Sequence, residues 1–230
     1  MSNIHEVLST FSPAIIAILD SIDFFQIEGT YDAQEVLTSI PASAWRSYEK
    51  ESKAKNTAIW GILSAVLVPR ALMAGARQVG RSYDITVERK TVQGFIREYY
   101  DERGLSLVRQ MTATDKTKLK AFIWSNANQN ERPLAKQVMK EPNLRYITDL
   151  TEARTRTIKR TEIGRATRAG SWGFARDVGF AEKTWMTAGD ARVRPSHAYL
   201  NGVTIPIDKD FSGEGQYPSA INCRCHLTYG

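Results

Sequence analysis

Two cysteines near the C-terminus, Cys223 and Cys225, are the only cysteines of the 230-residue chain. In an extended segment, side chains two residues apart point to the same side. Both thiols would then face together and Arg224 would face away. A disulfide between them would be strained, because their side-chain vectors are parallel. Thiolates and imidazoles are preferred zinc ligands, so the pair could contribute to a zinc site. The further candidate ligands are His197, His226 and Asp190.

Three interpretations of this set compete. Structural zinc sites usually separate their cysteines by two or more residues, so the C-x-C spacing is a weak match. We favour a packed, hydrogen-bonded network that holds a small sheet together. On this view no cofactor is expected, and zinc on His197, Cys223 and Cys225 is the alternative. The third interpretation is a metal-dependent nuclease or hydrolase that uses Asp190 with those three residues. The sequence has no Gly-rich phosphate loop and no nucleophile elbow. We therefore predict no enzymatic activity and no catalytic residue.

The clearest basic segment runs from Arg145 to Arg176 and holds eight Lys or Arg against three acids. The chain as a whole has a net charge of +6, which is compatible with nucleic-acid contact without demonstrating it. A charged helix face is usually only solvated, and the sequence shows no recognition motif. The segment thus favours non-specific contact with DNA over sequence recognition, and it gives little support to a host DNA-binding protein. The candidate DNA-binding residues are Arg154, Arg156, Lys159, Arg160, Arg165 and Arg168.

Helices must position most of these residues. Apolar spacing predicts a helix over residues 43–79, kinked or split at Pro69, and shorter helices over 92–100 and 105–111. Thr112 and Asp115 have the spacing of a capping box and predict that another helix begins there. A further helix is expected over 134–140, after a polar loop over 126–133. The longest is expected over 148–178, with a break near Gly170 and a stop at Gly179.

The chain beyond Gly179 favours short strands. We predict strands over 183–187 and 225–229, and a type I′ hairpin at Asn201-Gly202 between residues 199–200 and 203–207. The predicted fold class is α+β, a mostly helical N-terminal body followed by a small C-terminal unit with a long helix and a short antiparallel sheet. The expected boundary gives a helical body over 1–147 and a C-terminal domain over 148–230.

Composition limits the setting in which this protein works. Two cysteines cannot supply a disulfide framework, which suits a reducing cytoplasm. The N-terminus lacks a basic leader, so no secretory signal is expected. The most apolar run, residues 58–68, is shorter than the roughly 20 residues of a membrane-spanning helix. We therefore expect no membrane segment.

The last 70 residues carry an ordered set of motifs. An R-T-E segment at 160–162 precedes W-x-T-x-x-D-x-R-V-R-x-x-H at 185–197, then a turn at Asn201-Gly202, Pro218 and the C-R-C element. This combination resembles the Mu F-like head-morphogenesis family, the minor head proteins of tailed phages. The motif residues carried over are Trp185, Asp190, Arg192, Arg194, His197, Gly202, Pro218, Cys223, Arg224 and Cys225.

The resemblance implies a minor structural protein of the phage head, made in the host cytoplasm and placed inside the virion near the portal vertex. Its implied partners are the portal protein, double-stranded DNA bound without sequence preference, and capsid or scaffolding protein. Ejection with the DNA is a further expectation from the family. The helical body over 1–147 is the candidate portal-docking region. Because the chain ends at Gly230, soon after the C-R-C element, no appended toxin or enzymatic domain is expected.

Overall fold

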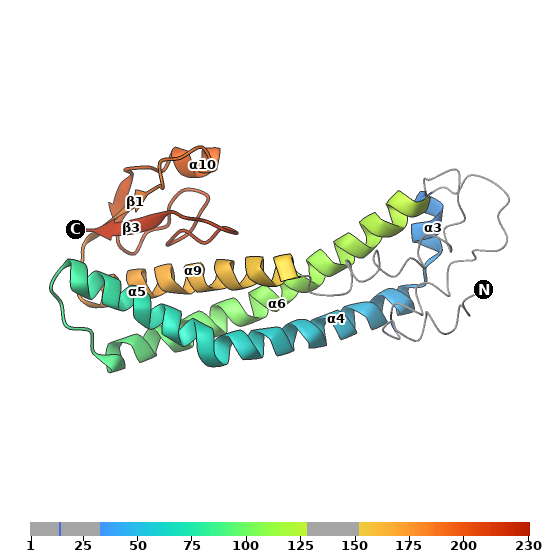
Figure 1. Cartoon of the computed structure of the whole chain (residues 1–230), viewed down its shortest axis with the longest axis horizontal. Helices are drawn as coiled ribbons and strands as arrows, with labels where there is room; N and C mark the ends of the chain where they lie inside the picture. Colours follow the sequence, from blue (N-terminus) through green and yellow to red (C-terminus); the bar gives the residue numbers. More distant parts are fainter. Residues whose placement is uncertain (1–13, 15–32, 128–151) are drawn as a thin grey trace. The chain divides into compact units, whose positions relative to one another are not determined.

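The computed structural model describes residue 14, residues 33–127 and residues 152–230 (Figure 1). The fold is α+β, as predicted, with long helices followed by a three-stranded antiparallel sheet. The chain forms two compact units. The first comprises Met1–Ile59 and Ser106–Glu152, and the second comprises Trp60–Leu105 and Ala153–Gly230. This division differs from the expected boundary after residue 147, because two long helices each contribute to both units.

The first helical stretch consists of α3 (Ala33–Ser39), α4 (Ala42–Ile62), a π-helical turn η1 (Leu63–Leu67) and α5 (Val68–Ser82). Pro69 does not kink the middle of a helix. It stands in the first turn of α5, where its missing N–H is not needed. The irregularity is taken up one turn earlier by η1, whose wider hydrogen-bond spacing accommodates an extra residue.

The span Ala42–Ser82 is long and apolar enough to cross a membrane by length and composition alone. It contains an 18-residue window with a mean hydropathy of 1.6, of which 28% is buried. Core helices of soluble proteins meet the same criterion, so it is weak evidence for a membrane segment. Its C-terminal part supplies core residues, because Ala76 and Val79 of α5 belong to the main apolar cluster of the second unit.

Helix α6 (Arg89–Ala127) is continuous, so the prediction of separate helices over 92–100 and 105–111 and of a new start at Thr112 was wrong. The Thr112 hydroxyl donates to the Val108 carbonyl at 2.8 Å within the helix. Asp115 is buried and accepts hydrogen bonds from Ser52 (2.6 Å) and Asn56 (3.0 Å) of α4. Thr112 and Asp115 therefore belong to a polar contact between α6 and α4 within the first unit, and not to a helix start. The expected helix over 134–140 and most of the loop before it lie outside the described residues.

Helix α9 (Glu152–Asp177) runs without the expected break at Gly170. This glycine meets α5 instead: a Cβ atom there would lie 2.0 Å from the Leu72 carbonyl oxygen. Gly75 of α5 is its counterpart, because a Cβ atom there would lie 1.8 Å from the Thr167 carbonyl oxygen. The two glycines let two helix backbones approach closely.

The predicted stop at Gly179 is confirmed. Gly179 has φ +91°, and its N–H donates to Arg176 while that of Phe180 donates to Ala175. These two bonds form a Schellman motif that satisfies the last carbonyls of α9. The sharp turn that follows sends the chain directly into the first strand.

The sheet has the order β2-β1-β3, with both pairings antiparallel. Its strands are β1 (Glu182–Met186), β2 (Thr204–Pro206) and β3 (His226–Tyr229), which places strands where the first and last were predicted. The hairpin prediction was wrong. Residues 195–198 form the short helix α10 (Pro195–Ala198), and β2 pairs with β1 instead of with residues 199–200. Gly202 does have a positive φ, +79°, and Asn201 does not.

One face of the sheet covers the helices of the second unit (Figure 1). Its core joins Val79 of α5, Phe95 of α6 and Phe174 of α9 to Trp185 and Leu227 of the sheet. The Tyr83 hydroxyl adds a clasp, donating to the Tyr229 carbonyl at 2.7 Å and accepting from the Tyr229 N–H at 2.9 Å. The two segments of the second unit, residues 60–105 and 153–230, therefore build one core together.

Candidate functional site

Trp185 is the centre of the predicted site and is fully buried in the middle of β1. Its ring meets the His197 imidazole edge-on at 5.2 Å between centroids, and the Phe211 ring at 5.1 Å. His197 lies on α10, a helix that Pro195 starts, and is 1% exposed. The chain between Trp185 and His197 thus folds back, so that the imidazole packs against the indole.

Both cysteines face this histidine. The Sγ atoms of Cys223 and Cys225 each lie 3.4 Å from His197 Nδ1. Both thiols are free, and the Cys225 N–H donates to the Cys223 sulfur at 3.4 Å. Burial raises the pKa of Cys225 to about 11, and the neighbouring Cys223 adds to the shift. Residues 223–225 precede β3 and belong to no strand. The two thiols lie together, while Arg224 pairs with Asp190.

Glu214 completes the surroundings of His197. Its Oε1 lies 3.2 Å from His197 Nε2, on the opposite side of the ring from the thiols. Sequence reasoning missed this residue. Gly213 and Gly215 on either side both have positive φ, and a bridge joins Phe211 to Gly215, so the loop turns tightly at the glutamate. The sequence signal was the G-E-G triplet within the Gly-rich loop.

Asp190 is not part of this cluster. It accepts two hydrogen bonds from the Arg224 guanidinium, one of them at 2.6 Å, and one from the Arg192 N–H at 3.0 Å. The bonds from Arg224 lower the pKa of Asp190 to about 2. Arg194 donates to the Ile221 carbonyl at 2.5 Å. The charged residues of the motif therefore fasten the loop before α10 to the segment that carries the cysteines.

The inner face of α9 holds the same segment from the other side. The Arg165 Nε donates to the Ser219 carbonyl at 2.8 Å, and the Arg168 Nε donates to the Pro218 carbonyl at 2.6 Å. Arg168 also donates to the Cys223 carbonyl at 3.2 Å. Both guanidiniums had been predicted as DNA contacts, and both are engaged with backbone carbonyls of the C-terminal loop.

The other basic candidates have different surroundings. Arg156, Lys159 and Arg160 are exposed on α9. The side chain of Arg154 lies outside the described part of the chain. Glu162, from the R-T-E segment, is buried and accepts from Arg103 of α6 at 2.7 and 3.0 Å. The segment thus divides into an inner face that holds the fold together and an outer face that is exposed.

Lys183 is a buried cation that sequence reasoning also missed. It points inward from β1, donates to Gln216 at 2.7 Å and lies 5.5 Å from the ring centroids of both Trp172 and Phe211. Burial lowers the pKa of Lys183 to about 8. Its alternation with Trp185 on one face of β1 was the available signal, but a lysine at an inward position contradicts the usual pattern.

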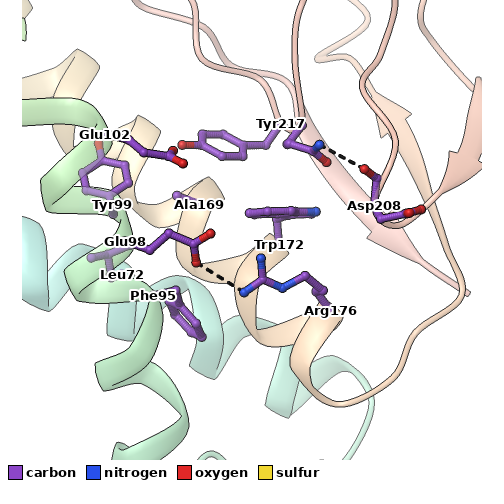
Figure 2. A pocket seen from close by; sticks show the side chains of 11 residues that line it. Leu72, Phe95, Glu98, Tyr99, Glu102, Ala169, Trp172, Arg176, Asp208 and Tyr217 are labelled. Atoms are coloured by element: carbon purple, nitrogen blue, oxygen red, sulfur yellow. Dashed lines mark hydrogen bonds and ion pairs between the residues drawn. The ribbon is translucent and has the colours of Figure 1, made fainter. Parts of the chain in front are cut away.

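A pocket of about 310 Å³ opens between α6, α9 and the loop around Tyr217 (Figure 2). Trp172 and Arg176 stack in it, 4.8 Å apart from guanidinium carbon to ring centroid, and Arg176 pairs with Glu98 at 3.4 Å. The lining contains three carboxylates and one guanidinium, so its charge disfavours DNA. None of the motif residues around His197 lines it.

The comparisons with known proteins agree with these motifs. Residues 126–228 match the family described as Phage Mu protein F like protein. This segment, somewhat less than half of the chain, is similar to that family. No curated protein and no solved structure matches the chain. The resemblance stated from the sequence is therefore confirmed, and it connects the chain with bacteriophage head morphogenesis.

The geometry explains why the Mu F-like motifs occur together. In this chain Trp185, His197 and the two cysteines meet in the core, and Asp190 and Arg224 meet at its edge. The R-T-E segment contributes Thr161, whose hydroxyl accepts from the Asn222 N–H at 3.2 Å, and Glu162, which pairs with Arg103. Each motif supports a contact between segments that are distant in the sequence.

Proposed function

We propose that this protein is a minor structural and assembly protein of a tailed-phage head, associated with the portal vertex and the packaged DNA and ejected with that DNA. The observation that carries the proposal is the match of residues 126–228 to the Mu F-like family. The buried set around His197 supports attachment over turnover, because its imidazole is 1% exposed. Neither pocket described in the second unit is lined by Asp190, His197 or the cysteines.

The hydrolase alternative loses its main support from this geometry. It required Asp190, His197 and the cysteines to surround a metal and a substrate, but Asp190 is committed to Arg224. A general base must also reach its substrate within hydrogen-bond distance. A structural protein without enzymatic activity is the function that these contacts favour.

For DNA, we propose the exposed face of α9. Arg156, Lys159 and Arg160 recur at helical spacing on its outer side, whereas Arg165 and Arg168 are engaged with the C-terminal loop. Contact with phosphates releases counterions, so the log–log slope of affinity against salt should be about −0.9 per contact. Such binding would be independent of base sequence.

For the portal, we propose the first unit as the docking region. Deleting residues 1–100 would not test this, because residues 60–105 belong to the second unit and supply part of its core. Charge reversal at exposed positions leaves both cores intact. On α4 of the first unit, Arg46, Lys50 and Lys53 are exposed.

The primary experiment is mass spectrometry of intact virions, which should find the chain in a low, fixed ratio to portal. Its absence from virions would refute the proposal. Two triple variants then separate the partners. The variant with Arg46, Lys50 and Lys53 changed to Glu should lose co-purification with portal and retain DNA binding. The variant with Arg156, Lys159 and Arg160 changed to Glu should do the reverse. Loss of both functions in both variants would contradict the assignment of separate surfaces.

A further inference from the structure

The cluster of His197, Cys223 and Cys225 is the group of potential metal ligands that stands out among the described residues. Its three donor atoms lie within 4.8 Å of one another. We propose that it binds one zinc ion through His197 Nδ1 and the Sγ atoms of Cys223 and Cys225, and that this ion fastens α10 to the C-terminal segment. The role is structural, and the proposal holds independently of the virion assignment.

The distances from the histidine nitrogen to the two sulfurs fit zinc. Bonds of about 2.3 Å to sulfur and about 2.0 Å to nitrogen at a tetrahedral angle separate nitrogen from sulfur by about 3.5 Å. The observed distance from Nδ1 is 3.4 Å to each sulfur. The three donor atoms lie within 4.8 Å of one another, and a tetrahedral site places two sulfurs about 3.8 Å apart. Rotation of the cysteine side chains by up to about 1 Å would therefore let one ion bond all three atoms.

The surroundings of the ligands resemble an outer coordination shell. A metal-bound histidine usually directs its other ring nitrogen to a carboxylate or carbonyl, which fixes its tautomer. Here Nε2 lies 3.2 Å from Glu214 Oε1, near a carboxylate although not in hydrogen-bond geometry with it, and Nδ1 faces the two thiols. The Cys225 N–H donates to the Cys223 sulfur, and Arg168 holds the Cys223 carbonyl. The three ligands are thus positioned by contacts that need no ion.

The chemistry of the donors selects the metal. Two thiolates and one imidazole are soft and borderline ligands, which favour zinc over magnesium or calcium. Each thiol releases its proton to solvent when it bonds the ion, so binding involves no redox step. Among the described residues no fourth His, Cys, Asp or Glu joins the group. Water, or a side chain from a partner, would complete the tetrahedron on the half-buried side of Cys223.

Two other residues considered from the sequence do not belong to the ligand set. Asp190 is paired with Arg224. His226 is exposed, and its neighbours Cys225 and Leu227 are buried, so it lies on the outer face of β3. His226 therefore provides a matched control, because it is a histidine adjacent to a ligand but directed away from the cluster.

The test uses the full chain without a His tag, purified with a reductant and without chelators. Elemental analysis should find about one zinc per chain. A mercurial that titrates both thiols should release it. Cobalt(II) in place of zinc should give the strong visible bands of a tetrahedral site and a thiolate charge-transfer band. The variant His197→Gln should lose these bands, and His226→Gln should keep them.

Several results would overturn the proposal. The proposal is wrong if the protein holds far less than one zinc per chain after refolding with zinc while both thiols remain titratable. It is also wrong if the purified protein contains a Cys223–Cys225 disulfide. Because the zinc content, mercurial release and cobalt spectrum are all measured on the unmodified chain, the test does not depend on whether His197→Gln folds. A cobalt spectrum lost equally in His226→Gln would place the site elsewhere.

Discussion

The contact between α5 and α9 predicts that Gly170→Ala strongly destabilises the second unit. A Cβ atom at Gly170 would lie 2.0 Å from the Leu72 carbonyl oxygen, whereas ordinary contact begins at 3.4 Å. The helices would have to separate by about 1.4 Å. The obstacle is backbone within a helix, so no side-chain rotation relieves it.

The expected magnitude follows from two opposing effects. Alanine improves helix propensity over glycine by about 1 kcal/mol. Overpacking a core costs about 1–3 kcal/mol and sometimes more, and the upper end applies to a rigid backbone. Separation of the helices would also loosen their shared core around Phe174 and Val79. We expect Gly170→Ala to lower the free energy of unfolding by at least about 2 kcal/mol in spite of its better propensity.

The matched control is Gly94→Ala, also in a helix of the second unit. A Cβ atom at Gly94 would meet nothing within 4 Å, so only the propensity gain of about 0.5–1 kcal/mol should remain. Urea unfolding followed by circular dichroism measures both variants, and hydrogen exchange of the α9 amides localises the effect. If Gly170→Ala were as stable as Gly94→Ala, the close approach of α5 and α9 would be refuted.

Three further substitutions test the charged groups. Glu162→Gln removes the buried carboxylate that pairs with the half-buried Arg103 and should cost about 3 kcal/mol in thermal or urea unfolding. A loss below about 0.5 kcal/mol would show that the pair is dispensable. Lys183 has a pKa of about 8 in the folded protein against 10.5 for a free lysine, so between these values the unfolded chain binds more protons. The free energy of unfolding relative to that of Lys183→Met should therefore rise by at most about 3 kcal/mol as the pH increases from about 8 to 10. A pH-independent difference would contradict a buried, neutralised amine. Asp190 has a pKa of about 2 in the folded protein against 3.8 for a free aspartate. The free energy of unfolding should therefore exceed that of Asp190→Asn above pH 4, and the difference should disappear as the pH falls toward 2. A difference that persists at pH 2 would contradict the pairing with Arg224.

Local patterns in the sequence predicted the local features of the fold. The stop at Gly179, the strands at β1 and β3, and the common direction of the two thiols all depend on near neighbours. The failures came from contacts over long sequence distances. Gly170 suggested a break because its partner, Gly75, could not be known to face it. Thr112 and Asp115 suggested a helix start because Ser52 and Asn56 were not known to bind them.

The candidate site shows the same limit. The sequence identified His197 and both cysteines as a group but could not separate them from Asp190, which lies nearby in the sequence and has a different partner. It also missed Glu214, whose relevance appears only when the loop brings it to the imidazole. Among the basic residues of α9, composition could not distinguish Arg165 and Arg168, which hold the loop, from the exposed outer face.

The second unit is built from two segments, residues 60–105 and 153–230, and neither contains the whole core. A fragment that began at residue 126, where the family match starts, would lack α5 and all of α6 except its last two residues. The apolar sides of Phe174, Trp185 and Leu227 would lose the helices that cover them and would be laid bare to water. Such a fragment should aggregate or bind chaperones, so the recognisable motif and the smallest soluble folding unit have different boundaries in this chain.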